Sequence, residues 1–185
     1  MRALPTALPG VLVVEPEVYR DGRGLFLETH HADKYAAVGI ALPFVQDNYS
    51  SSGARTLRGL HTQVGRHPQG KLVHALRGEI FDVAVDVRRG SPTFRRWVGV
   101  KLTGDDFRQL YVPPGFLHGF CVLGAAAEVA YKCTAPWDPG AEVSVRWDDP
   151  ELAIDWPLAD PVLSAKDAAA PRLAEVLDRL PTYGT

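Results

Sequence analysis

Short apolar runs separated by glycine- and proline-containing turns fill most of the chain. The runs are rich in Val, Leu, Phe and Tyr, and turns such as LRGE, LTGDD and VPPGF separate them at intervals of roughly 8–12 residues. In the segment 81–88, FDVAVDVR, apolar and polar residues alternate, which predicts a half-buried strand with one face in water. Because long helical patterns do not alternate with these runs, we expect an all-β fold in which antiparallel strands close into a jelly-roll barrel.

Two segments carry a helical pattern. The first, HHADKYAAVG at 30–39, is short, and Gly39 is positioned to end it. The second, SAKDAAAPRLAEVLDRLP at 164–181, predicts a helix near the C-terminus with one apolar stripe, formed by Leu173, Val176, Leu177 and Leu180. No internal repeat or low-complexity linker is visible, so we expect residues 1–185 to form one domain whose helical tail starts at about residue 164.

Composition and charge narrow the class of protein. Of the 185 residues, 46% are hydrophobic and 23% charged, which is typical of a globular domain and excludes a disordered chain. The 20 basic and 22 acidic residues are interspersed, so we expect no nucleic-acid partner and no attraction to an anionic membrane. Two cysteines, no signal-peptide pattern and no long apolar stretch predict a cytoplasmic protein.

The densest cluster of polar residues within apolar sequence is LRGLHTQVGRHPQGKLVHALRGE, at 57–79. A barrel with a His-x-His pair can bind a divalent metal, but here Gln63 stands where a second imidazole would follow His61, and an amide is a poor ligand. His67, His74 and Glu79 are irregularly spaced substitutes. We therefore expect no metal, and a metal-dependent enzyme remains an alternative.

Arg58 and Lys71 in the same segment could hold an anion, because the guanidinium fork matches phosphate oxygens and an ammonium adds a point charge. Exposed strand-edge charges are an ordinary alternative explanation. Arg58 and His61 are three residues apart, so a regular strand would direct them to opposite faces. A bulge at Gly59 could direct both into one cavity.

Three further polar residues combine a possible function with an ordinary structural explanation. His118 lies between apolar residues after a Pro-Pro-Gly turn. Tyr131 continues a strand pattern in EVAYKCT, where a buried tyrosine with one hydrogen bond is common. Asp167 follows Ser164 by three residues, which fits a helix capping box.

Taken together, eight segments resemble the dTDP-4-dehydrorhamnose 3,5-epimerase family, the cupin-type sugar-nucleotide epimerases. They occur in the family's order across nearly the whole chain: PGVLVVEPEVYRDGRGLFLE, FVQDNYSSS, TLRGLHTQ, KLVHALRGEIFDVAVDVRRGSPTF, YVPPGFLHGF, EVAYKCT, VRWDDPELAIDWP and LSAKD. The resemblance implies a cupin fold, a homodimer and catalysis without metal or organic cofactor. It implies epimerisation of dTDP-4-dehydro-6-deoxy-D-glucose at C3 and C5 to dTDP-4-dehydro-L-rhamnose.

The resemblance also implies a role for individual residues. His61 would be the general base, oriented by Asp167, and Tyr131 would be the acid on the opposite face of the sugar. Lys71 would stabilise the enolate oxygen. The substrate would be bound by a wider set, of which the first three are expected to reach in from a partner subunit: Arg23, Phe26, Glu28, Gln46, Asn48, Arg58, His118, Trp137 and Glu142.

One segment departs from the family pattern. Where the family carries Tyr-Tyr before Asp-Pro, this chain reads Ala-Pro-Trp-Asp-Pro at 135–139. Trp137 keeps a flat aromatic face but lacks the hydroxyl, which leaves a mono-epimerase acting at C3 or C5 alone as an alternative. A sugar-nucleotide-binding protein without activity is a third possibility. The combined presence of His61, Tyr131 and Asp167 argues against it, because pure binding does not need an acid and a base.

Overall fold

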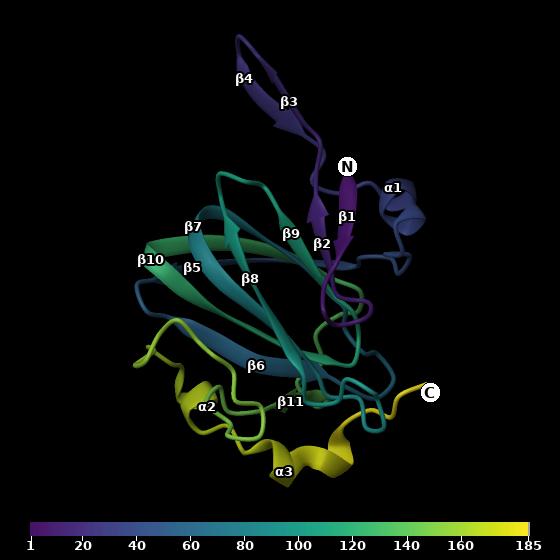
Figure 1. The fold of residues 1–185 in the computed structure, drawn as a ribbon, viewed down its shortest axis with the longest axis vertical. Helices are drawn as coiled ribbons and strands as arrows, with labels where there is room; N and C mark the ends of the chain where they lie inside the picture. Colours follow the sequence, from purple (N-terminus) through teal and green to yellow (C-terminus); the bar gives the residue numbers. More distant parts are fainter. Residues whose placement is uncertain (185) are drawn as a thin grey trace.

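A computed structural model describes residues 1–184 of the protein. Antiparallel strands make up most of the structure (Figure 1). The strands are β1 (Arg2–Pro5), β2 (Leu12–Glu15), β3 (Val18–Asp21), β4 (Gly24–Leu27), β5 (Gln46–Gly53), β6 (Leu57–Gln63), β7 (Lys71–Asp86), β8 (Trp97–Thr103), β9 (Gln109–Val112), β10 (Phe116–Cys133) and β11 (Glu142–Ser144). The helices are α1 (Ala32–Ala37), α2 (Ala165–Ala168) and α3 (Leu173–Val176), followed by a 3₁₀ turn, η1 (Leu177–Arg179). The predicted all-β jelly roll is confirmed.

Two long strands, β7 and β10, form the centre of the fold, and each changes its outer neighbour halfway along. β7 pairs with β9 through residues 71–74 and with β8 through residues 79–85. β10 pairs with β6 through residues 118–121 and with β5 through residues 126–133. Both strands therefore contribute to both layers of the sandwich (Figure 1).

Gly78 lies where β7 and β10 change neighbours. Its φ is +76°, and a Cβ there would lie 2.1 Å from the carbonyl oxygen of Ala126. Only glycine combines this backbone conformation with such a close approach of the facing strand. The register between the two strands shifts at the same place, between Val122 and Ala127.

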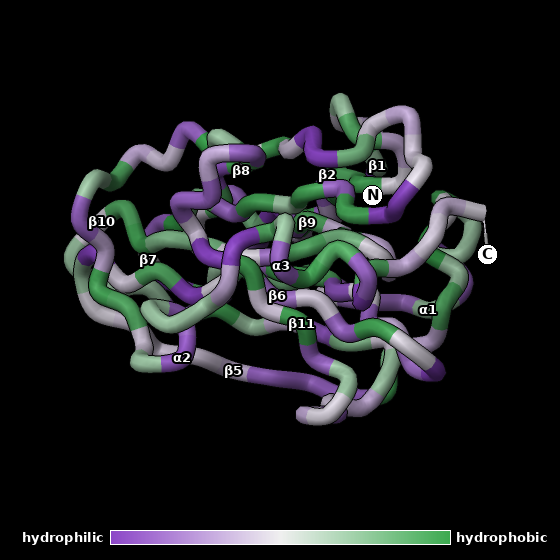
Figure 2. The backbone as a smooth tube through the Cα atoms, turned by 90° about the horizontal axis from the view of Figure 1, so that it is seen from below, coloured by the Kyte–Doolittle hydropathy of each residue, from purple (hydrophilic) through white to green (hydrophobic). Residues whose placement is uncertain are grey.

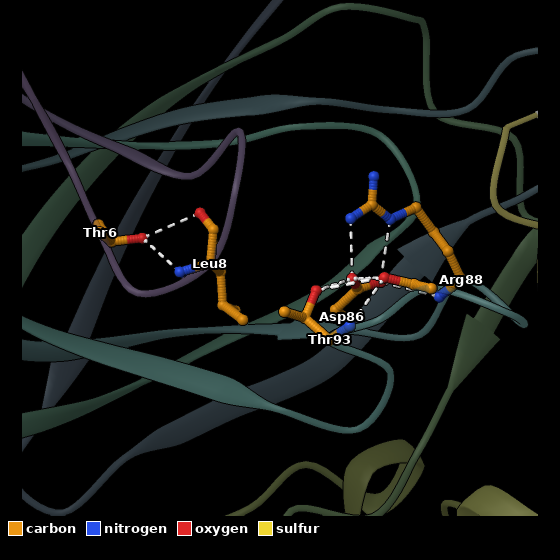
Figure 3. A network of polar contacts seen from close by, with 6 residues as sticks. Thr6, Leu8, Asp86, Arg88 and Thr93 are labelled. Atoms are coloured by element: carbon orange, nitrogen blue, oxygen red, sulfur yellow. Dashed lines mark hydrogen bonds and ion pairs between the residues drawn. The ribbon is translucent and has the colours of Figure 1, made fainter.

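The second half of β7 is buried on both faces, so the predicted wet face is wrong. Its apolar residues pack in two different clusters of the core, one on each side of the strand. Asp82 and Asp86, expected in water, are both 0% exposed. His118 contacts one oxygen of the Asp82 carboxylate, and Arg88 with Thr93 contacts both oxygens of Asp86 (Figure 3). Hydrogen bonds therefore replace water at Asp86 and at one oxygen of Asp82.

Apolar and polar segments are divided unevenly among the strands. In the view from below, green apolar stretches follow β7 and β9, whereas β5 is purple along much of its length (Figure 2). β5 has the sequence QDNYSSSG, in which exposed residues alternate with half-buried ones and with the buried Ser52. A polar strand therefore lines one side of the sandwich, where polar side chains can meet a ligand.

The C-terminal segment forms two short helices and a 3₁₀ turn, where the sequence predicted one helix. Pro171 interrupts the pattern, because proline lacks the amide hydrogen and disfavours helical geometry in the residue before it. The predicted apolar stripe is nevertheless buried, since Leu173, Val176 and Leu180 pack in the same cluster as Val83. None of the helices in residues 1–184 is long and apolar enough to cross a membrane.

The hairpin formed by β3 and β4 extends away from the rest of the chain (Figure 1). It forms a two-stranded sheet of its own and exposes apolar side chains, with Phe26 65% exposed and Tyr19 51%. The predicted helix after it is confirmed as α1, and Gly39, at φ +96°, follows its end.

Candidate active site

His61 on β6 and Asp167 on α2 meet although 106 residues separate them in the chain. Nε2 of His61 lies 2.6 Å from Oδ1 of Asp167. Ser164 caps α2, and its Oγ accepts a hydrogen bond from the backbone N–H of Asp167 at 3.1 Å. The predicted cap is present, but it uses the backbone of Asp167, so the carboxylate is free to turn towards His61.

The protonation states of this pair follow from its surroundings. Burial raises the pKa of Asp167, but the hydrogen bond and charge of His61 and the contact with Ser164 outweigh burial and hold that pKa below its usual range. An ionised carboxylate can only accept hydrogen bonds, so Nε2 of His61 carries the hydrogen. The lone pair is then on Nδ1, and the imidazole can act as a base through that atom.

Two adjacent cavities share His61, Lys71 and Tyr131 in their walls, and we refer to them together as the cleft. The first cavity has a volume of about 290 Å³ and the second of about 510 Å³. The first also contains four predicted substrate-binding residues, namely Gln46, Asn48, Trp137 and Glu142. The second also contains Arg58, His118 and Asp167. The three shared residues therefore lie where the two cavities adjoin.

A bulge in β6 brings Arg58 and His61 to the same cavity. On β10, His118 pairs with His61 and Phe120 pairs with Arg58, so β6 has one extra residue between the two pairs. Gly59 has φ +131°, and a Cβ there would lie 2.6 Å from the Cα of Gly119. Arg58 is held by a hydrogen bond of 3.0 Å from its Nε to Oγ of Ser52 on β5.

Lys71 and Tyr131 add a cation and a phenol to the wall of the cleft. Lys71 opens β7 and pairs in register with Cys133, while Tyr131 lies two residues before Cys133 on β10. Burial lowers the pKa of Lys71 and raises that of Tyr131. Burial thus favours the neutral, proton-carrying form of the phenol.

His118 and Asp82 form a second histidine–carboxylate pair in the interior of the sandwich. Nε2 of His118 lies 2.7 Å from Oδ1 of Asp82, and His118 is directly opposite His61 in the β6–β10 register. Burial lowers the pKa of His118 despite the opposing effect of the Asp82 carboxylate. The ring is therefore neutral near pH 7, and it presents an uncharged polar wall to the second cavity.

Hydrogen bonds fix the predicted binding residues of the first cavity. Gln46 Nε2 donates to Oδ1 of Asn48 at 3.0 Å, and the amide of Asn48 donates to Sγ of Cys133 at 3.4 Å. Trp137 Nε1 donates to Oε2 of Glu142 at 2.9 Å. Burial raises the pKa of Glu142, but its contacts with Lys166 and Trp137 outweigh burial and lower it.

Three predicted substrate-binding residues lie outside the cleft within a single chain. Arg23 and Phe26 line a separate groove of about 430 Å³ on the β3–β4 hairpin. Glu28 pairs with Lys34 and lines a cavity of about 340 Å³ beside α1. The structure therefore does not bring these residues to His61 in one subunit.

The histidine-rich segment does not form a metal-binding cluster. Within residues 1–184, no group of three or more His, Cys, Asp or Glu side chains has a geometry that could hold a metal ion. Gln63, which replaces the second histidine of the His-x-His pattern, donates hydrogen bonds to two backbone carbonyls, those of His67 and Pro136.

Sequence reasoning missed three residues that complete the site. Lys166 lines the second cavity and pairs with Glu142; its place next to Asp167 in LSAKD was an available signal. Asp82 lies in an alternating strand pattern, which predicts a surface residue, yet it is 0% exposed. Gln69, which lines the first cavity, lies in a loop and carries no pattern that would have identified it.

Comparisons with known proteins agree with this geometry. The family model described as dTDP-4-dehydrorhamnose 3,5-epimerase matches residues 5–175. The chain is 49% identical to the dTDP-4-dehydrorhamnose 3,5-epimerase of Salmonella typhimurium, over 96% of this chain and 98% of that protein. It is 42% identical to a dTDP-4-dehydrorhamnose 3-epimerase of Streptomyces niveus, over 100% of this chain and 91% of the relative.

A solved structure resembles the whole chain. It is the dTDP-6-deoxy-D-glucose-3,5-epimerase of Legionella pneumophila in complex with dTDP-4-keto-L-rhamnose. Its TM-score to this chain is 0.95 at 50% sequence identity, covering 100% of this chain and 99% of that one.

Proposed function

Because the chain belongs to the dTDP-4-dehydrorhamnose 3,5-epimerase family, it is an isomerase, and we propose that its cleft inverts dTDP-4-dehydro-6-deoxy-D-glucose at C3 and C5. The product is dTDP-4-dehydro-L-rhamnose. The observation that carries this proposal is the 2.6 Å contact between His61 and Asp167 in the wall of a cleft that Tyr131 and Lys71 also line.

The first step is removal of a proton next to a ketone. C3 and C5 both flank the C4 carbonyl, so the electron pair left by the proton can move into an enolate. Nδ1 of His61 takes the proton, and Asp167 stabilises the imidazolium that forms. The Lys71 ammonium faces the negative charge that develops on the C4 oxygen, and stabilisation of such charge is usually the largest catalytic contribution.

The second step returns a proton to the opposite face of the ring. Tyr131 donates its phenolic hydrogen to the carbon, the enolate electrons re-form the ketone, and solvent restores both protein groups. The raised pKa of Tyr131 supports this role, because the phenol then keeps its hydrogen at neutral pH. Each positioned acid or base typically contributes roughly 10²–10⁴ to the rate. These steps move only protons, so they call for no redox cofactor and no metal.

The nucleotide end of the substrate would be held by charges and amides around the cleft. Arg58 supplies a guanidinium to the diphosphate in the second cavity. Gln46 and Asn48 supply hydrogen bonds in the first cavity, where Trp137 presents its aromatic face to the sugar. His118 lines the sugar pocket as a neutral ring.

A homodimer would complete the site. An isolated two-stranded hairpin is marginally stable in water, so the exposed apolar side chains of the β3–β4 hairpin support its packing against a second copy of the chain. In such a dimer, Arg23, Phe26 and Glu28 would reach the nucleotide bound by the neighbouring subunit.

The whole chain would act as one domain in the cytoplasm. Packing of the C-terminal Leu173 in the same apolar cluster as Val83 of β7 supports a single domain. Cys121 and Cys133 are both buried and free, which supports a reducing compartment. Separation of cell extracts into soluble and envelope fractions tests the location.

A mono-epimerase is the second candidate, favoured by Trp137 in place of the family tyrosine and by the similarity to a 3-epimerase. Incubation of the 4-keto substrate in D₂O with NMR detection separates the candidates. Deuterium at both C3 and C5 supports the proposal, deuterium at one carbon indicates a mono-epimerase, and no deuterium indicates a binding protein. Loss of exchange in EDTA would instead indicate a metal enzyme.

A further inference from the structure

Three glutamine side chains hold the loop that carries Trp137. This loop, residues 134–141, connects β10 to β11 and is called the Trp137 loop below. Nε2 of Gln69 donates to the carbonyl of Ala135 at 2.7 Å. Nε2 of Gln63 donates to the carbonyl of Pro136 at 3.0 Å. The backbone N–H of Trp137 donates to Oε1 of Gln46 at 2.7 Å. Side-chain amides therefore bind three consecutive loop residues, 135 to 137.

Gln63 holds the loop at the largest number of points. Its Oε1 accepts the backbone N–H of Asp138 at 2.8 Å, so it binds the loop on both sides of Trp137. Its Nε2 also donates to the carbonyl of His67 at 2.6 Å. Gln63 is 3% exposed, and each of these hydrogen bonds joins its amide to a backbone group. A buried amide of this kind is costly to remove, because the loop groups it binds lose their partners.

Gln63 and His61 lie on the same face of β6, because residues two apart in a strand point the same way. In the pairing with β11, Glu142 lies opposite Gln63, and Ser144 lies opposite His61. Gln63, which binds the Trp137 loop, and His61, which lines the cleft, are thus two residues apart on the same strand. A displacement of the loop relative to β6 changes the distance between the indole and the imidazole.

The contacts continue from the Trp137 loop to Lys166 and Asp167, which line the second cavity. From Trp137, Nε1 donates to Glu142, whose other carboxylate oxygen pairs with Lys166. Lys166 is the neighbour of Asp167, which contacts His61. This series of contacts therefore starts and ends on β6, at positions 63 and 61.

We propose that Gln63 is a positioning residue that fixes the Trp137 indole as a wall of the sugar site, and that this wall determines whether both carbons are inverted before release. The inference rests on the proposed epimerase function. Two inversions require the sugar to remain in the cleft through two proton abstractions. A loosened wall lets the singly inverted sugar leave after the first one.

The test is a double-mutant cycle with Gln63→Ala, Trp137→Ala and the combined variant, assayed in D₂O for kcat, KM and deuterium at C3 and C5. We expect Gln63→Ala to lower kcat on the order of 10- to 100-fold, because small misplacements of a positioned group have effects of this size. We also expect singly labelled sugar to accumulate. If Gln63 acts through Trp137, the combined variant lies within about twofold of Trp137→Ala alone.

Gln109→Ala is the matched control. Gln109 is also a buried glutamine, 1% exposed, and binds the carbonyl of Thr29 and the hydroxyl of Tyr35, away from the cleft. It should lower the melting temperature and leave the labelling ratio unchanged. If Gln63→Ala does not fold, Gln69→Ala replaces it in the cycle, with a smaller effect in the same direction.

Multiplicative effects of the two substitutions, or an even labelling ratio in Gln63→Ala, would overturn the inference and leave the epimerase function intact. Absence of exchange in the unsubstituted protein would instead overturn the proposed function itself. The two failures are therefore distinguishable in one set of spectra.

Discussion

Nε2 of His61 and Oδ1 of Asp167 are 2.6 Å apart, and this contact joins the middle of the β-sandwich to its C-terminal segment. Asp167 is 4% exposed, so its carboxylate has lost most of its water and depends on protein donors. The pair therefore serves two purposes, since it orients the imidazole for proton abstraction and attaches α2 to β6.

Asp167→Asn should lower kcat while the protein still folds. The substituted amide can donate to Nε2 of His61, which moves the ring hydrogen to Nδ1 and removes the lone pair from the cleft. We expect kcat to fall on the order of 10²–10⁴ with little change in KM. Steady-state kinetics measures both constants. The control is Asp148→Asn, an exposed carboxylate that pairs with Arg146, and equal losses in the two variants would contradict the role of Asp167.

The alkaline limb of the pH profile should belong to Lys71. Burial lowers the pKa of Lys71 towards neutral pH and raises the pKa of Tyr131 away from it. Activity is present below the Lys71 pKa and disappears above it, at a pH lower than the usual lysine value of about 10.4. Lys71→Arg should move this limb upwards, because a guanidinium stays charged beyond about pH 12. Profiles of kcat/KM for both proteins test this, and an unchanged limb would assign it to another group.

The fold class could be predicted from the sequence because period-two apolar runs and turn residues are local signals. Whether a strand is buried on both faces depends on distant parts of the chain, so no local signal reveals it. Asp82 and Asp86 look like solvent-facing residues in FDVAVDVR. The partner of Asp82, His118, lies 36 residues away, and Asp86 needs the turn that brings Ser91 and Thr93 beside it in addition to Arg88. The single helix expected at 164–181 failed for a local reason, Pro171, which outweighed the apolar stripe.

The candidate site was predicted mainly from resemblance, with one exception. The parity conflict between Arg58 and His61 required a bulge, and Gly59 was the residue able to provide it; the register of β6 against β10 contains that bulge. Gln63 was identified only as a departure from a metal-binding pattern. Its contacts with residues 136 and 138 depend on a loop more than 70 residues away, which no spacing rule reveals.

Asp86 should be a main contributor to stability. Its carboxylate accepts hydrogen bonds from Arg88 and Thr93 (Figure 3) and from Ser91. These hydrogen bonds outweigh burial and lower the pKa of Asp86. Asp86→Ala should lower the free energy of unfolding by about 1–3 kcal/mol, because the buried Ser91 hydroxyl and the half-buried Arg88 guanidinium lose their acceptor. Urea unfolding measures this difference.

Asp106→Ala is the control for Asp86, because Asp106 binds Arg108 at the same two-residue spacing on the surface. It should change stability by less than about 0.5 kcal/mol. The pH dependence gives a second check. The Asp86 pKa is lower in the folded state, so its contribution is complete above the unfolded value of about 3.9 and disappears as pH falls through the folded value. If the difference in free energy of unfolding between the wild type and Asp86→Ala increased as the pH fell, this assignment would be contradicted.

Phe26→Asp should disrupt the proposed dimer. Phe26 is 65% exposed on the projecting hairpin, and a carboxylate there opposes burial against a second subunit. Sedimentation velocity should give twice the 20.2 kDa chain mass for the wild type and a larger monomer fraction for the variant. The KM for substrate should rise as well. Leu76→Asp, at another exposed apolar position, is the control; a wild-type monomer would rule out the dimer.

His61 and Tyr131 have separate roles in the proposed mechanism, one removing a proton and the other returning it, and isotope labelling distinguishes these roles. Both residues line both cavities of the cleft, and in the proposed mechanism they act on opposite faces of one sugar ring. Incubation of dTDP-4-dehydro-6-deoxy-D-glucose in D₂O with His61→Asn, with Tyr131→Phe and with the control His67→Asn separates proton removal from inversion. NMR reports deuterium content and configuration at C3 and C5 in each sample.

We predict no deuterium with His61→Asn, because nothing removes the proton. With Tyr131→Phe we predict deuterium at the original configuration, since the imidazolium can return a solvent-derived deuteron only to the face it took the proton from. His67→Asn should give inverted, doubly labelled product like the wild type. Inverted product from Tyr131→Phe at the wild-type rate, or exchange at the wild-type rate in His61→Asn, would contradict the central claim.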